Sequence, residues 1–189
     1  MFLVTFHPVT RGAEDSRTAL EELCHALEAF PSARIIWTFP NADSEGRLLR
    51  QTIEQWAAAR PHQVLLTASL GQQNYLSTLK LADVVIGNSS SGIIEAPAAG
   101  TPTVNIGSRQ DGRPQATSIV SCAAEQKAIE TAIEQTLTPD FRHRIQNQKI
   151  PFGRGKSAAA IIHRLKQTKL TELSQKTFYD LPDFDEEPE

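Results

Sequence analysis

The chain has 189 residues, of which 40% are hydrophobic and 22% charged, and its formal net charge is −3. This length suits one domain or two small ones, and the composition argues against wholesale disorder. Six of the 22 acidic residues and none of the 19 basic ones lie in residues 180–189, so the rest of the chain is only slightly basic, too little for a general nucleic-acid surface.

Cysteine content and hydropathy narrow the class further. Cys24 and Cys122 are too few for a disulfide framework, and we interpret both as reduced, buried residues of a cytoplasmic protein. No apolar run approaches the roughly 20 residues of a membrane span. The chain begins directly in a predicted strand without a signal peptide, and from this we expect a further segment upstream.

The first half of the chain is typical of strand–helix pairs. An apolar run predicts a strand over residues 2–6, and His7-Pro8 ends it. Asp15 or Ser16 is expected to cap the next helix, which Pro31 terminates. Further strands are predicted over 34–39 and 64–67, with helices over about 44–60 and after Gly71.

The second half continues the alternation. A strand over residues 84–87 runs into the loop Asn88-Ser89-Ser90-Ser91-Gly92. The helix after this loop is expected to be short or kinked, because Pro97 lies inside it, and Gly100 ends it. Strands are then predicted over 103–106 and 118–122, and helices over about 123–137, 139–147 and 157–169.

The order of these elements predicts the fold class. Strands and helices alternate, and the strands are short and apolar rather than alternating in polarity, as expected of strands buried on both faces. We therefore predict an α/β protein with a doubly wound parallel sheet. We assign residues 1–170 to this domain and 171–189 to a C-terminal segment with an acidic tail.

Four polar loops follow predicted strands, and ligands of such sheets bind at the carboxyl ends of the strands. The serine loop at 88–92 offers hydroxyls and helix-terminal N–H groups to a phosphate, while Glu95 can accept from the hydroxyls of a ribose. The alternative is an ordinary helix cap and tight turn.

The other loops leave similar choices. His7 can contact a phosphate or act as an acid or base, or it can be a structural histidine. Arg109 and Arg113 can neutralise a diphosphate, or they can lie on a solvated loop. The segment around Gly155-Lys156-Ser157 is not a P-loop, because Ile150 stands where the first glycine is required. The histidines and cysteines have no metal-ligand spacing.

The loops taken together, in their order, resemble one family. The motifs that carry the resemblance are the segments 7–10, 39–43, 86–97, 100–113, 151–155 and 178–181. They are similar to the C-terminal half of UDP-N-acetylglucosamine 2-epimerases, over nearly the whole chain.

The resemblance implies a Rossmann-like domain that forms half of a glycosyltransferase-B-type fold and binds UDP or UDP-N-acetylglucosamine, with no cofactor. In that family the catalytic cleft lies between two domains, and His7 would lie nearest the chemistry. The implied roles of the other residues are the diphosphate for Ser89, Ser90 and Arg109, the ribose for Glu95, the uracil for Leu70, and the cleft wall for Asn41.

The serine loop and Ser108-Arg109-Gln110 resemble the hydrolysing branch of the family, which eliminates UDP to a glycal and adds water to give N-acetylmannosamine for sialic-acid-type sugars. The family's N-terminal domain has no counterpart in these residues, so we expect the chain by itself to be inactive. The alternatives are half of a glycosyltransferase of the same fold, or a non-catalytic module that binds a nucleotide sugar.

The segment beyond Thr171 carries apolar residues, such as Phe178 and Tyr179, directly before six acids. In two-domain relatives the last helix crosses to the other domain. We therefore expect this segment to be disordered or to dock on a second copy as a homodimer.

Overall fold

A computed structural model describes residues 1–9, 15–41, 46–153 and 155–169 of the protein. The chain divides into two compact units, Met1–Phe152 and Gly153–Glu189. The second unit contains the helix α8 (Ser157–Gln167), which we had assigned to the domain 1–170. The predicted C-terminal segment 171–189 lies outside the described residues, and the functional division of the chain stays a prediction.

The first unit is built on a six-stranded sheet in the order β3-β2-β1-β4-β5-β6. Every pairing is parallel, and the register places Thr5 opposite both Thr38 and Gly87. The doubly wound parallel sheet expected from the sequence is thus confirmed. The strands are β1 (Phe2–Thr5), β2 (Ile35–Thr38), β3 (Val64–Thr67), β4 (Val84–Gly87), β5 (Thr103–Ile106) and β6 (Ile119–Cys122).

Burial separates the inner strands from the outer ones. β1, β4 and β5 are buried along their whole length. The expectation that all strands are buried on both faces is wrong for β3 and β6, which have no fully buried residue. These two strands lie at the edges of the sheet, where one flank has no neighbouring strand, and Leu65 is 59% exposed.

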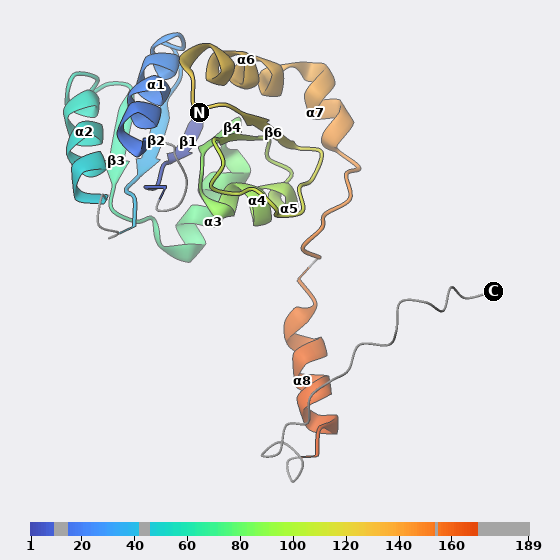
Figure 1. Ribbon diagram of the computed structural model, residues 1–189. Helices are drawn as coiled ribbons and strands as arrows, with labels where there is room; N and C mark the ends of the chain where they lie inside the picture. The colour runs from blue at the N-terminus through green and yellow to red at the C-terminus, as the bar shows by residue number, and fades with distance from the viewer. Residues whose placement is uncertain (10–14, 42–45, 154, 170–189) are drawn as a thin grey trace, which may run out of the picture. The chain divides into compact units, whose positions relative to one another are not determined.

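Helices cover both faces of the sheet (Figure 1). The larger core contains Val4, Trp37 and Ile86 and is closed by α1 and α6, whereas Leu3 and Val85 point into a smaller core with residues of α3 and α5. Neighbouring residues of one strand therefore face different helical layers. The helices of this unit are α1 (Ser16–Glu28), α2 (Gly46–Ala58), α3 (Gly71–Leu81), α4 (Ser90–Ile94), α5 (Ala96–Ala99), α6 (Gln126–Leu137) and α7 (Pro139–Ile145).

Local signals set several of these boundaries. Asp15 caps α1 by accepting from the N–H of Arg17. The helix after the serine loop is interrupted as expected, with Pro97 in the first turn of the separate helix α5. Gly100 ends α5 in the left-handed conformation, at φ 76°, which favours glycine.

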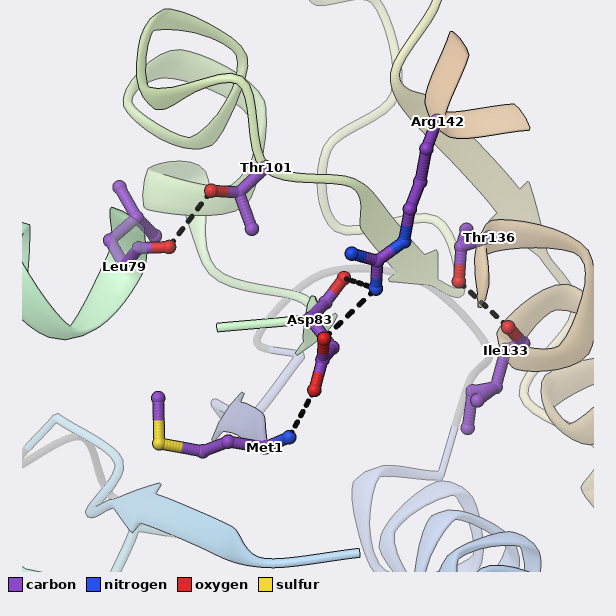
Figure 2. Close-up of polar contacts among 7 residues, drawn as sticks. All are labelled: Met1, Leu79, Asp83, Thr101, Ile133, Thr136 and Arg142. Atoms are coloured by element: carbon purple, nitrogen blue, oxygen red, sulfur yellow. Dashed lines mark hydrogen bonds and ion pairs between the residues drawn. The ribbon is translucent and has the colours of Figure 1, made fainter. Parts of the chain in front are cut away.

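Polar contacts join the amino ends of the inner strands to helices that are distant in the sequence (Figure 2). The Asp83 carboxylate accepts from the amino group of Met1 and from Arg142 Nη2, the latter at 3.0 Å. The Thr101 hydroxyl donates to the carbonyl of Leu79 at 2.8 Å and so joins the end of α3 to the segment before β5. These contacts fix the amino ends of β1, β4 and β5.

Both cysteines are free thiols. Cys24 is buried, and burial raises the pKa of its thiol to about 12. Cys122 is only partly buried, contrary to the sequence-based expectation, because it ends the edge strand β6. Burial still raises the pKa of its thiol to about 11. None of the helices in the described part of the chain is both long enough and apolar enough to cross a membrane.

Candidate functional site

A cleft of about 490 Å³ opens at the carboxyl ends of β1 to β4. It lies where the strand order turns from β1 to β4, the position at which doubly wound sheets bind ligands. Loops that are far apart in the sequence meet there. The lining residues are Thr5, His7, Thr38, Phe39, Pro40, Asn41, Ala68, Ser69, Leu70, Gly71, Gln72, Tyr75, Leu76, Ser89, Ser91 and Glu95.

Asn88 holds the two central loops of the cleft together. Its side chain is fully buried, and its Oδ1 accepts from the backbone N–H of His7 at 2.7 Å. Its Nδ2 donates to the carbonyl of His7 at 2.8 Å. A single amide thus bonds both backbone groups of His7. This pair of bonds fixes the loop after β1 against the loop after β4.

The His7 ring is oriented by the loop after β2. The backbone N–H of Asn41 donates to Nδ1 of His7 at 3.1 Å. Because Nδ1 accepts, the neutral imidazole carries its proton on Nε2. His7 is 7% exposed and lines the cleft. A buried imidazole with a defined tautomer can donate a hydrogen bond or transfer a proton through Nε2.

Close backbone contacts shape the turn from β4 into α4. Gly87 has φ 132°, and a Cβ atom at this position would lie 2.0 Å from the carbonyl oxygen of Thr5. Gly92 packs on β5, where its Cβ would lie 2.8 Å from Cγ2 of Thr103. Only glycine fits these positions without a shift of the neighbouring atoms. Ser89 caps α4, accepting from the N–H of Ser91 at 3.4 Å.

A tyrosine and a glutamate complete the wall formed by α3 and α4. The Tyr75 hydroxyl lies 2.6 Å from Oγ of Ser91. Burial raises the pKa of the Tyr75 phenol, the hydrogen bond with Ser91 lowers it, and the charge of Glu95 raises it. The phenol therefore stays protonated at neutral pH, and the Glu95 carboxylate lies close enough to influence it.

The loop after β5, which carries Arg109 and Arg113, contacts the serine loop through the backbone carbonyl of Asn88. Nη1 of Arg109 donates to the backbone carbonyl of Asn88 at 3.2 Å, and Nε2 of Gln110 donates to the same oxygen at 2.8 Å. Arg109 therefore lies against the loop that carries Ser89 but does not line the cleft. Arg113 is exposed.

Comparison with known proteins identifies the family. The family model of UDP-N-acetylglucosamine 2-epimerase matches residues 1–166. The chain belongs to the UDP-N-acetylglucosamine 2-epimerase family. The family resemblance proposed from the loop motifs is thereby confirmed.

Curated relatives of this 2-epimerase family chain include two bacterial proteins. The GDP/UDP-N,N'-diacetylbacillosamine 2-epimerase (hydrolyzing) of Campylobacter jejuni is 35% identical over 96% of this chain and 47% of the relative. The polysialic acid biosynthesis protein P7 of Escherichia coli is 28% identical over 96% of this chain and 46% of the relative. The chain thus spans about half the length of the curated relatives it matches.

A solved structure supports the fold. The UDP-GlcNAc 2-epimerase of Neisseria meningitidis bound to UDP-GlcNAc superposes with a TM-score of 0.62 at 15% identity, over 88% of this chain and 44% of that chain. The 2-epimerase family chain therefore has the Rossmann-like architecture of one half of a glycosyltransferase-B-type fold.

The cleft unites most of the site residues expected for a 2-epimerase. His7, Asn41, Leu70, Ser89 and Glu95 all line it. Ser90, Arg109 and Arg113 do not, since Ser90 begins α4 beside the cleft and the two arginines belong to the loop after β5. The ligand-binding roles of all eight residues stay predictions.

Sequence reasoning gave no individual role to two residues of the site, Asn88 and Tyr75. Asn88 was considered only as part of the serine loop, although it joins that loop to His7. Tyr75 was interpreted only as a helix marker. Ser91 was predicted, with the other serines of its loop, to offer a hydroxyl to a phosphate, but its contact with Tyr75 was not foreseen. Tyr75 follows β3 in the chain, so its place after a parallel strand was the one available signal.

The chemistry of the cleft is that of hydroxyls, an imidazole and a carboxylate. Among the described residues, no group of three or more histidines, cysteines or acids could hold a metal ion. The polar groups suit a ligand that combines an anion with hydroxyl donors.

Proposed function

We propose that this chain is the UDP-binding half of a hydrolysing UDP-N-acetylglucosamine 2-epimerase. The full enzyme would eliminate UDP from UDP-N-acetylglucosamine to form a glycal and then add water to give N-acetylmannosamine. The observation that carries the proposal is the convergence of His7, Ser89 and Glu95 on one cleft of a family member. The word "hydrolyzing" in the name of the Campylobacter jejuni relative supports the choice of branch.

The nucleotide would be held by groups of complementary chemistry. Ser89 and Ser90 would donate to the diphosphate at the start of α4, and Arg109 would supply positive charge from behind the loop. Glu95 would accept from the ribose hydroxyls. The backbone around Leu70 would contact the uracil, and Asn41 would line the sugar side of the cleft. Arg113 would add only a distant charge.

His7 would be the residue of this half closest to the reaction. The Asn41 N–H bond to Nδ1 directs Nε2 as the donor, which suits a group that hydrogen-bonds a departing phosphate oxygen. The proton transfers at the sugar would need carboxylates from a second domain. Because catalytic groups must be held in register on both walls of a cleft, the chain by itself would bind UDP without turning over the nucleotide sugar.

The test combines binding and turnover on the full chain. Titration calorimetry should detect weak UDP binding with little further gain from the sugar. Incubation with UDP-N-acetylglucosamine should release no UDP above the uncatalysed rate. Release of UDP by the purified chain would overturn the proposed inactivity, and absence of UDP binding would overturn the proposed nucleotide site.

The branch and the reaction type are tested on a longer polypeptide that carries this chain in frame with a second domain. Free N-acetylmannosamine and UDP are the expected products. UDP-N-acetylmannosamine as product would indicate a non-hydrolysing epimerase. Transfer of the sugar to an acceptor would indicate a glycosyltransferase instead. The proposed site of action is the cytoplasm.

A further inference from the structure

Two hydroxyl groups face each other on the wall of the cleft, and the proposed nucleotide site leaves their contact unexplained. Tyr75 comes from α3 and Ser91 from α4, and both line the cleft. Their oxygens are 2.6 Å apart, and either can be the donor. Each hydroxyl has one proton and can also accept. The bond between them uses one of the two protons, so the pair has one proton left for a ligand.

The backbone of Ser91 is already engaged. Its N–H donates to Oγ of Ser89, and its carbonyl accepts from the N–H of Glu95. Any contribution of Ser91 to ligand binding must therefore come from its side-chain hydroxyl. The position of that hydroxyl beside Tyr75 makes the direction of their hydrogen bond decisive.

An anionic ligand that accepts a hydrogen bond from Ser91 determines that direction. The ionised oxygens of a diphosphate accept hydrogen bonds and carry no proton to donate. A Ser91 hydroxyl that donates to such an oxygen can only accept from Tyr75, so Tyr75 must be the donor of the pair. Burial raises the pKa of the Tyr75 phenol, and the phenol therefore keeps the proton it has to donate at neutral pH.

We propose that Tyr75 is a positioning residue for the diphosphate: its hydroxyl donates to Oγ of Ser91 and turns the Ser91 proton toward the ligand. The inference rests on the proposed nucleotide site. A donor chain of this kind, from Tyr75 through Ser91 to the ligand, orders the serine hydroxyl before the ligand arrives. Without the tyrosine hydroxyl, Ser91 is free to point its proton elsewhere, and binding must include the cost of orienting it.

The proposal makes the effect of the tyrosine hydroxyl specific to phosphate. Tyr75→Phe keeps the ring, which packs against the smaller core beside Leu3 and Leu79, and removes only the hydroxyl. A bond between neutral groups corresponds to about a two- to tenfold change in affinity. Tyr75→Phe should therefore weaken UDP binding by about that factor and leave uridine binding unchanged, because uridine carries no phosphate.

The experiment is a double-mutant cycle on the 189-residue chain. UDP and uridine are titrated into the wild type, Tyr75→Phe, Ser91→Ala and the double variant, with binding followed by NMR. Ser91→Ala should weaken UDP at least as much as Tyr75→Phe, and the double variant should match Ser91→Ala, because Tyr75 acts through Ser91. Ser77→Ala, an exposed hydroxyl on the same helix, is the matched control and should change neither ligand.

The outcomes separate this inference from the proposed function. If the wild type binds UDP but Tyr75→Phe binds it equally well, or loses uridine and UDP affinity alike, the positioning role is wrong and the nucleotide site stands. If the wild type binds no UDP, the proposed site and the positioning role both fall. Ser91→Ala is an independent check should Tyr75→Phe not fold: unchanged UDP affinity in that variant also refutes the inference.

Discussion

Two hollows of similar size lie at opposite ends of the same strands. The cleft at the carboxyl ends measures about 490 Å³, and a second hollow at the amino ends of β2 and β3 measures about 470 Å³. Residues 31–34 and 59–63 line the second hollow, from the two turns that precede those strands. Segments that follow four different strands, together with α3 and α4, line the first. Volume therefore does not distinguish the two, but the number of converging segments does.

The polar side chains near the two hollows also differ in whether they bond within the protein or line the hollow. At the amino ends, Arg60 donates to the carbonyl of Trp56 at 2.9 Å, stacks on the Trp56 ring and pairs with Glu28. Gln63 donates to the carbonyl of Phe30 at 3.0 Å. These side chains close the turns between helices and strands. At the carboxyl ends, Asn88 performs that structural task, and the surrounding hydroxyls, imidazole and carboxylate line the cleft.

The largest expected effect concerns the side-chain amide that joins two chain segments near each hollow, Asn88 at the carboxyl ends and Gln63 at the amino ends. Asn88→Ala removes both side-chain hydrogen bonds to the buried backbone of His7. At about 1–3 kcal/mol each, their loss should lower the free energy of unfolding by about 2–6 kcal/mol. Gln63→Ala removes one part-buried bond and should cost only about 1 kcal/mol. Denaturant unfolding measures both variants, and a loss of about 1 kcal/mol or less for Asn88→Ala would show that the carboxyl-end loops do not depend on Asn88.

The second largest effect should be on UDP affinity, which should depend on a glutamate of the cleft and not on one near the amino-end hollow. Removing the Glu95 carboxylate would delete the charged acceptor proposed for the ribose, and such bonds are worth about 1.5–3 kcal/mol. Glu95→Ala should therefore weaken UDP about ten- to a hundredfold in titration calorimetry. Glu28→Ala, the matched glutamate near the amino-end hollow, should leave UDP affinity unchanged. Equal UDP affinity for Glu95→Ala and the wild type would remove Glu95 from the site.

A smaller effect should separate the two arginines of the loop after β5. Arg109 contacts the carbonyl of Asn88 beside the cleft, whereas Arg113 is exposed. Partly exposed charges interact by about 1 kcal/mol or less. Arg109→Met should thus weaken UDP about fivefold, and Arg113→Met less than about twofold. The difference should shrink in high salt, and a larger effect for Arg113 would reverse the assigned order of the two residues.

The smallest effect belongs to the ion pairs at the amino ends of the strands. The hydrogen bond from the Met1 amino group, together with that from Arg142, lowers the pKa of Asp83 below its usual value of 3.8. The stability from this carboxylate is therefore present above about pH 4 and is lost as the pH falls through the lowered pKa. Because Asp83 is 44% exposed, its contribution is screened and amounts to about 0.5 kcal/mol.

Thermal unfolding of Asp83→Asn measures this contribution. The variant should be slightly less stable than the wild type at pH 7, and the two curves should converge in strong acid. UDP binding at pH 7 should be unaffected, since Asp83 precedes β4 and the cleft lies beyond its other end. A difference that grows toward low pH would contradict the assigned direction of the pKa shift.

The sequence determined the element order, because strand and helix signals are local. The strands Val64–Thr67, Val84–Gly87 and Thr103–Ile106 have the bounds that their apolar runs predicted. Pro97 and Gly100 marked the interrupted helix correctly, since proline restricts the backbone and glycine allows the positive φ at which the helix ends. The loops that carry His7, Ser89 and Glu95 were found in the same way, because they follow strands whose carboxyl ends share one edge of the sheet.

Only the tertiary structure decided which strands are buried and which side chains meet. The apolar residues of β3 and β6 resemble those of inner strands, and their exposure follows from their places at the sheet edges. The bonds of Asn88 to His7 and of Tyr75 to Ser91 join residues 81 and 16 positions apart. Such contacts depend on how the sheet and helices pack in space, and no local pattern of residues encodes that packing.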